Sequence, residues 1–136
     1  MDYTNKGFGT KCVHAGNVHD KQYGALTMPI YQTSTFVFDS CEQGAARFSG
    51  QEAGYIYSRL GNPTTSVLEA KIAALDGAEA TLATSSGMGA ISSTLWTIAK
   101  AGAHIVADGT LYGCTYALLS HGLTRYGVEV PILSPL

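Results

Sequence analysis

The chain has 136 residues, of which 46% are hydrophobic and 13% charged, and its formal net charge is −2. Its basic residues are scattered singly, which argues against a surface that binds nucleic acid. This length suits one small domain with a modest core. Soluble proteins usually contain ~25% charged residues, which is more than this chain has. We therefore expect other subunits, or a further part of the protein, to cover much of its surface.

Residues 1–61 predict an irregular N-terminal arm. They are rich in Gly, Thr, Ser, Gln and Tyr, and Pro29 interrupts any helix there. A short helix is predicted near Ser40–Phe48, capped by Asp39 or Ser40. An arm of this length is unstable alone, so we expect it to wrap around a partner subunit.

Residues 62–136 predict regular structure, beginning with a helix that Asn62 caps and Gly77 ends. The next helix follows a glycine-rich turn and is expected to bury one apolar face. A third helix is expected from about Gly113 to Tyr126, with three leucines inward. The two apolar faces comprise Met88, Ile91, Leu95 and Ile98 in one helix, and Leu118, Leu119 and Leu123 in the other.

Three short strands are expected between these helices, over Ala80–Thr84, His104–Ala107 and Val128–Leu133. Pro131 argues for an edge position or an early end of the last strand. The alternation of strand and helix predicts an α/β fold, with parallel strands and right-handed crossovers. So small a sheet leaves its edges open, so we expect it to be incomplete.

The cysteines, histidines and apolar runs exclude several further classes. Three cysteines, odd in number and far apart, argue against a disulfide framework or a zinc site and favour reduced thiols in the cytoplasm. The histidines share no spacing, so we expect no metal site. No apolar run approaches ~18 residues and the N-terminus is polar, so neither a transmembrane helix nor a signal peptide is expected.

The turn from Ser85 to Ala90 predicts a phosphate site. Gly87 and Gly89 let the backbone approach a ligand, and the amides that open a helix attract anions. The alternative is that both glycines only allow close packing of strand and helix. The third glycine of the dinucleotide fingerprint is missing, because position 92 is Ser92, and no Gly-Lys-Ser/Thr follows as in nucleotide hydrolases.

Two further pairs could carry chemistry. Arg59 offers a planar fork suited to phosphate, and Tyr57 shares its side if the backbone is extended. Tyr112 and Cys114 follow a predicted strand and turn, where an open α/β sheet gathers ligands. Tyr112 can stack on a bound ring, and Cys114 in a first helical turn can be reactive. The alternatives are a solvated Arg, packed tyrosines and a small buried Cys.

Jointly these motifs resemble the γ-family of pyridoxal-phosphate enzymes, the Cys/Met metabolism group. The resemblance runs from about His14 to about residue 130. Its specific parts are Pro29–Phe36, Tyr57–Thr64, Ser86–Ala90 and Tyr112–Thr115. It implies an N-terminal arm followed by the first part of the fold-type I (aspartate aminotransferase-like) large domain, with an incomplete parallel or mixed sheet and pyridoxal 5′-phosphate (PLP) as cofactor.

The resemblance also implies roles for the candidate residues. The amides of Gly87 and Met88 would hold the cofactor phosphate. Tyr57 and Arg59 would bind the same phosphate from the neighbouring subunit, because the family is usually a homotetramer of two catalytic dimers. Tyr112 would stack on the pyridine ring and help to protonate the departing thiol.

The reaction that the resemblance implies is an α,γ-elimination on a sulfur-containing amino acid. For L-methionine the products would be methanethiol, 2-oxobutanoate and ammonia. Cys114 would line the substrate pocket and favour methionine-type substrates. Cystathionine γ-lyases, cystathionine γ-synthases and O-acetylhomoserine sulfhydrylases of the same family, which commonly have Gly at this position, are the alternatives. A non-catalytic assembly partner and a fragment of a dinucleotide-binding oxidoreductase are alternatives from other classes.

The chain departs from the family at three catalytic positions. The Schiff-base lysine is expected well downstream, last in a Ser/Thr-rich context, as are the aspartate for the pyridine nitrogen and the arginine for the substrate carboxylate. The lysines here are Lys6, Lys11, Lys21, Lys71 and Lys100, none of them in that context. The last residues, Glu129–Leu136, also differ from the family pattern. The chain alone is therefore expected to be inactive.

Overall fold

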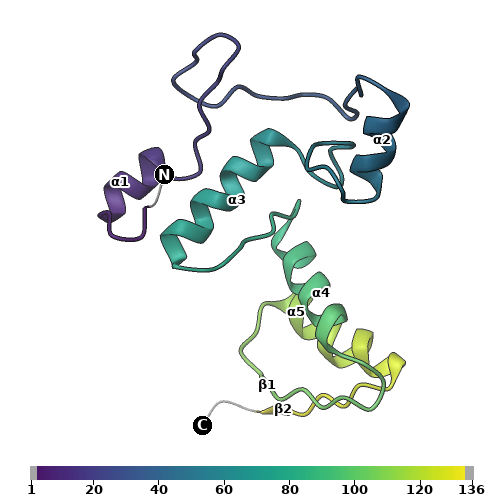
Figure 1. Ribbon diagram of the computed structural model, residues 1–136. Helices are drawn as coiled ribbons and strands as arrows, with labels where there is room; N and C mark the ends of the chain where they lie inside the picture. The colour runs from purple at the N-terminus through teal and green to yellow at the C-terminus, as the bar shows by residue number, and fades with distance from the viewer. Residues whose placement is uncertain (1–2, 134–136) are drawn as a thin grey trace. The chain divides into compact units, whose positions relative to one another are not determined.

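A computed structural model describes residues 3–133 (Figure 1). The last three residues of the segment that departs from the family pattern, Ser134–Leu136, lie outside the described residues. The chain divides into two compact units, with the boundary between Ala83 and Thr84. The first unit is helical and irregular, and the second contains the parallel strands.

The first unit contains three helices, α1 (Phe8–His14), α2 (Cys41–Phe48) and α3 (Pro63–Asp76). Two of them begin where the sequence predicts. Ser40 caps α2 by accepting a hydrogen bond from the Gln43 amide, and Asn62 caps α3 in the same way through the Thr64 amide, at 2.9 Å. Gly77 ends α3 at φ 67°, a left-handed conformation that favours glycine.

Helix α1 corrects the prediction of an arm that is irregular apart from α2. The residue before it, Gly7, has no side chain to cap it, so its stability comes from packing against α3, beside which it lies in Figure 1. Lys71 on α3 donates to the Val13 carbonyl at 3.2 Å. Gly16 has φ 77°, and a Cβ there would lie 2.5 Å from the Val67 carbonyl oxygen, so only glycine allows this close approach.

The second unit is a small α/β arrangement. Its elements are α4 (Gly87–Ile98), β1 (Ala107–Asp108), α5 (Gly113–Ala117), the π-helical η1 (Leu118–Gly122), the 3-10 helix η2 (Leu123–Tyr126) and β2 (Ile132–Leu133). Strands β1 and β2 pair in parallel, Ala107 with Ile132. The core comprises Leu119, Leu123 and Val128, with Leu95 and Ile105 packed against them. The helices therefore cover one face of the sheet (Figure 1).

The predicted helix over Gly113 to Tyr126 is confirmed, with a change of winding along its length. The two later strands are confirmed as a parallel pair but are shorter than predicted. Ile105, Ala107 and Gly109 donate their amides in turn to carbonyls of the other segment. Pro131 has no amide to donate, which interrupts the ladder and leaves His104 joined to Glu129 only by an isolated bridge.

Two sequence predictions are wrong. Ala80–Thr84 forms no strand in the described chain: the Ala83 amide donates instead to the Glu69 carboxylate at 2.8 Å. A strand needs a neighbour, and residues 3–133 provide none for this segment. Ile98 lies at the end of α4 and is 71% exposed rather than packed with Leu95.

Within the described range, no helix combines the length and apolarity needed to span a bilayer.

Candidate functional site

The start of α4 presents two backbone amides outward. Ser86 caps the helix, and its hydroxyl accepts a hydrogen bond from the Gly89 amide at 2.9 Å. The Ser86 carbonyl accepts from the Ala90 amide at 3.1 Å. Among the residues that the structure describes, the amides of Gly87 and Met88 have no acceptor. They therefore remain available to an anion at the positive end of the helix dipole.

The two glycines of this turn differ in what surrounds them. A Cβ at Gly89 would lie 3.2 Å from the Ser86 hydroxyl oxygen and 3.4 Å from the Thr84 Cβ, so this glycine allows the capping turn to close. A Cβ at Gly87 would meet no atom within 4 Å. Packing within this unit thus explains why position 89 is a glycine. It does not explain the glycine at position 87, which the close approach of a ligand would explain.

The beginning of α5 lies beside the beginning of α4 (Figure 1). The Thr115 hydroxyl donates to the Met88 sulfur at 3.6 Å, which ties the first turns of the two helices together. Thr115 is 8% exposed. Tyr112 immediately precedes α5 and is 69% exposed, so its ring is not part of the core of this unit. Sequence analysis missed Thr115, because nothing in its context indicates a contact 27 residues away.

Cys114 is exposed and interacts with Tyr112. The Tyr112 phenol donates a hydrogen bond to the Cys114 sulfur, and this bond and the charge of the Cys114 side chain raise the pKa of the phenol, with a smaller contribution from desolvation. The phenol therefore stays protonated to higher pH than an isolated tyrosine. Neither residue is buried in this unit, so the alternatives of a core Tyr112 and a small buried Cys114 do not describe it.

The turn before Tyr112 is fixed by Asp108. Its carboxylate accepts hydrogen bonds from the amide and the hydroxyl of Thr110, both at 2.6 Å. These bonds lower the pKa of Asp108, and the bond from the Thr110 hydroxyl contributes most. An Asx-type turn of this kind limits where the chain goes after β1, and so it limits where Tyr112 stands.

In the first unit, Tyr57 and Arg59 lie together. The Arg59 guanidinium carbon is 5.5 Å from the centroid of the Tyr57 ring. The two side chains lie together as expected, but a turn closed by the Leu60 amide on the Tyr57 carbonyl brings them together rather than an extended backbone. Both residues are exposed, Tyr57 by 39%. No carboxylate in the described chain forms an ion pair with Arg59. The pair thus presents five guanidinium donors and a hydroxyl to an external partner.

The structure therefore places the six predicted residues in two sets. Tyr57 and Arg59 belong to the first unit. The other set, Gly87, Met88, Tyr112 and Cys114, belongs to the second unit, where the Met88–Thr115 contact brings its two helix starts together.

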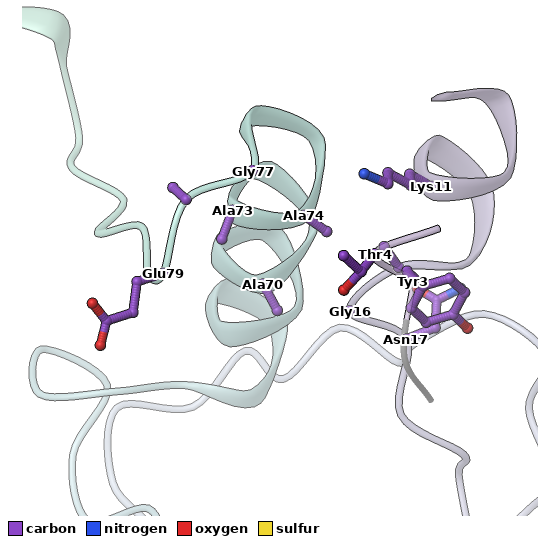
Figure 2. A pocket seen from close by; sticks show the side chains of 12 residues that line it. Tyr3, Thr4, Lys11, Gly16, Asn17, Ala70, Ala73, Ala74, Gly77 and Glu79 are labelled. Atoms are coloured by element: carbon purple, nitrogen blue, oxygen red, sulfur yellow. The ribbon is translucent and has the colours of Figure 1, made fainter. Parts of the chain in front are cut away.

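A cavity of about 550 Å³ in the first unit contains none of these residues. It lies where small residues of α3, such as Ala70 and Ala74, face the N-terminal segment. Figure 2 shows Lys11 on one side of α3 and Glu79 on the other, so its charged groups do not converge on one point. Within residues 3–133, no three His, Cys, Asp or Glu side chains gather as a metal ion would require.

Comparison with known proteins identifies the kind of ligand. Residues 9–135 match the model of the Cys/Met metabolism PLP-dependent enzymes. The chain belongs to this family. PLP is accordingly its cofactor, and the chain contains the N-terminal arm and the first part of the fold-type I large domain.

One sequence relative and two solved structures illustrate the match. The chain is 67% identical over 130 residues to an L-methionine gamma-lyase of Fusobacterium nucleatum subsp. polymorphum, covering 96% of this chain and 33% of that protein. The crystal structure of metB from Corynebacterium glutamicum superposes with a TM-score of 0.87 at 38% identity, over 98% of this chain and 33% of that one.

The second structure is a putative O-acetylhomoserine (thiol)-lyase, metY, from Campylobacter jejuni subsp. jejuni. It superposes with a TM-score of 0.86 at 35% identity, over 96% of this chain and 32% of that one. It contains N′-pyridoxyl-lysine-5′-monophosphate, in which the cofactor is joined to a lysine. The chain thus spans about a third of the length of the proteins it matches.

The residues present fit the phosphate of this cofactor. Within the described residues, the amides of Gly87 and Met88 have no acceptor at the start of α4, a Cβ at Gly87 would meet no atom within 4 Å, and Arg59 has no acidic partner. Helix starts and guanidinium groups are both well suited to bind phosphate.

Proposed function

We propose that this chain supplies the phosphate-binding third of a PLP-dependent carbon–sulfur lyase that performs the α,γ-elimination of L-methionine. The products are methanethiol, 2-oxobutanoate and ammonia. The observation that carries the proposal is the pair of unpaired amides at Gly87 and Met88, next to Tyr112 and Cys114, in a chain 67% identical to an L-methionine gamma-lyase.

Each candidate residue has a task in this proposal. The amides of Gly87 and Met88 hold the phosphate of PLP, and Tyr57 and Arg59 bind that phosphate from a neighbouring copy of the chain. These groups together would hold the phosphate end of the cofactor through charge-assisted hydrogen bonds. When bound, PLP supplies an electron sink that stabilises a carbanion at the substrate α-carbon.

Tyr112 and Cys114 act at the other end of the cofactor. The Tyr112 ring stacks on the pyridine ring, and its phenol donates a proton to the sulfur that leaves the substrate. The raised pKa of the phenol favours its protonated form, which is the form that can donate a proton. Cys114 lines the pocket, where its soft sulfur contacts a methionine-type side chain.

The chain by itself is inactive in this proposal because it lacks a lysine that can join the cofactor. In the second unit, α4 has 12 residues and is therefore about 18 Å long. Lys100 follows the far end of α4, away from Gly87. In the first unit, Lys71 is bonded to the Val13 carbonyl on α1.

The proposal also covers the assembly and its setting. Residues 1–61 form the arm between subunits, and residues 62–136 begin the PLP-binding domain. The whole protein is a cytoplasmic homotetramer of two catalytic dimers, and its partners are small sulfur-containing amino acids rather than nucleic acid or membrane.

The alternatives within the family are cystathionine γ-lyase, cystathionine γ-synthase and O-acetylhomoserine sulfhydrylase. The last is favoured by one observation, the structural match to a putative O-acetylhomoserine (thiol)-lyase. The alternative from another class is a non-catalytic chain that assembles with a longer homologue.

The test compares two proteins. One is the isolated chain. The other, the joined protein, carries this chain in place of the matching third of the Fusobacterium relative. We expect the joined protein to release methanethiol from L-methionine in the presence of PLP, and the isolated chain to release none.

Four results would count against the proposal. If the joined protein fails to bind PLP, the proposed phosphate site has no basis. If it converts O-acetylhomoserine and sulfide but not methionine, the alternative of an O-acetylhomoserine sulfhydrylase is supported. Methanethiol from the isolated chain refutes its inactivity. Co-elution of the isolated chain with the longer relative in size-exclusion chromatography supports the non-catalytic alternative.

A further inference from the structure

Asn62 makes contacts that exceed the needs of a helix cap. Its side chain is almost buried, with 7% exposed. Its oxygen accepts from the Thr64 amide, which completes the cap of α3. Its amide nitrogen then makes two more hydrogen bonds, to the Tyr31 carbonyl and to the Ser58 hydroxyl, each at 2.9 Å.

Ser58 continues this chain of contacts to the arm. Its hydroxyl donates to the Thr33 carbonyl, and its amide donates to the Ser34 carbonyl at 2.8 Å. The Phe36 amide donates in turn to the Ile56 carbonyl at 3.1 Å, and an isolated antiparallel bridge pairs Thr35 with Tyr57.

The position of Ser58 in the chain gives these contacts a consequence. Ser58 lies between Tyr57 and Arg59 in a turn, which the Leu60 and Gly61 amides close by donating to the Tyr57 carbonyl at 2.9 and 3.1 Å. Asn62 and the arm both hold Ser58, so these contacts fix the turn that carries Tyr57 and Arg59. In this turn the Arg59 guanidinium carbon lies 5.5 Å from the centroid of the Tyr57 ring.

We infer that Asn62 is a positioning residue for the phosphate site: through Ser58 it orients the segment from which Tyr57 and Arg59 reach the phosphate of PLP. The inference rests on the proposed function, because it assigns that ligand to Tyr57 and Arg59. Asn62 itself does not touch the cofactor. Groups that orient a binding residue typically contribute ~10–100-fold to affinity in metal sites, and the same logic applies here.

Asn62→Ser in the joined protein separates positioning from capping. Serine is as good a helix cap as asparagine, but it lacks the amide that donates to Tyr31 and Ser58. Ser58→Ala is the second variant: it leaves the Asn62 cap intact and removes the hydroxyl. Asn17→Ser is the matched control, since the Asn17 amide also donates to a backbone carbonyl, that of Val13, at 3.0 Å on an exposed surface.

The readout compares PLP with pyridoxal, which lacks the phosphate. We expect Asn62→Ser and Ser58→Ala each to raise the dissociation constant of PLP on the order of tenfold and to leave that of pyridoxal within about twofold. In the apo protein, amide hydrogen exchange at Phe36 and Ser58 should accelerate. Asn17→Ser should change none of these quantities.

The outcomes distinguish this inference from the proposed function. The positioning role is wrong if both variants weaken the binding of PLP and of pyridoxal equally. It is also wrong if neither variant weakens the binding of either compound. Arg59→Ala in the same assay tests the phosphate contact itself. If Arg59→Ala selectively weakens PLP while Asn62→Ser and Ser58→Ala do not, only the positioning role fails. If Arg59→Ala also leaves PLP binding unchanged, the proposed phosphate site fails.

Discussion

Replacement of Gly87 by alanine separates the folding role of this glycine from its binding role. A Cβ at this position meets nothing within 4 Å, so Gly87→Ala adds no clash in the described chain. Alanine is favoured over glycine in helices by up to ~1 kcal/mol, less at a first position. We therefore expect the unfolding midpoint of the apo joined protein to stay unchanged or to rise slightly.

The binding of PLP should respond in the opposite direction. A methyl group beside the Gly87 amide stands where a phosphate oxygen must come within hydrogen-bond distance. The loss of one hydrogen bond to a charged group corresponds to about 1.5–3 kcal/mol. Since 1.4 kcal/mol is tenfold in affinity, the dissociation constant should rise roughly 10- to 100-fold.

The assay is a titration of the apo joined protein with PLP, followed by cofactor absorbance, together with thermal unfolding. Gly9→Ala is the matched control, because Gly9 also lies in the first turn of a helix with nothing within 4 Å of its Cβ. It should leave PLP binding unchanged. Unaltered PLP affinity in Gly87→Ala would refute the reasoning, and a lowered unfolding midpoint would show that Gly87 serves packing.

Three further predictions concern the second unit. Leu123→Ala removes the fully buried side chain of the core and should cost about 2–5 kcal/mol, measured by urea unfolding; a loss below 1 kcal/mol would contradict the assigned core. Cys114→Ala should lower the pKa of Tyr112 in an ultraviolet titration, because the thiol and its charge raise it; an unchanged pKa would show that the two residues do not interact. Asp108→Asn should destabilise the protein at neutral pH. Because hydrogen bonds lower the pKa of Asp108 in the folded state, its stabilising effect is lost as the pH falls through that lowered pKa. The stability difference from the parent protein should therefore shrink in acid, and a difference independent of pH would count against the Asp108–Thr110 turn.

Local chemistry made helices α2 and α3 predictable. Asn62 and Pro63 at one end and Gly77 at the other define α3 within a few residues, and Ser40 defines α2. These signals act between residues two to four positions apart, so they need no knowledge of the rest of the fold. The inward leucines Leu119 and Leu123 were predictable for the same reason, from helical periodicity.

The missed and wrong elements depend on distant partners. Helix α1 has no cap of its own and is stabilised by α3, more than 50 positions along the chain. The apolar run Ala80–Thr84 has the composition of a strand, but no neighbouring strand lies in the described chain, and Leu82 is 77% exposed. A hydrophobic pattern indicates that a segment is buried in some assembly, and it does not identify what buries it.

The candidate site was predictable in its residues and not in its support. Glycines before a helix and an alternating Tyr-Ser-Arg are signals along the chain. The contact of Thr115 with Met88 and the two extra bonds of Asn62 join positions 27 and up to 31 residues apart. No spacing rule predicts such contacts, although they orient the groups that the sequence does reveal.

A crystal structure of the joined protein with PLP bound tests the central claim most directly. We predict that the amide nitrogens of Gly87 and Met88 lie about 2.7–3.2 Å from oxygens of the cofactor phosphate, and that Arg59 of a second copy reaches the same phosphate. A phosphate held elsewhere, with both amides turned to water, would contradict the account.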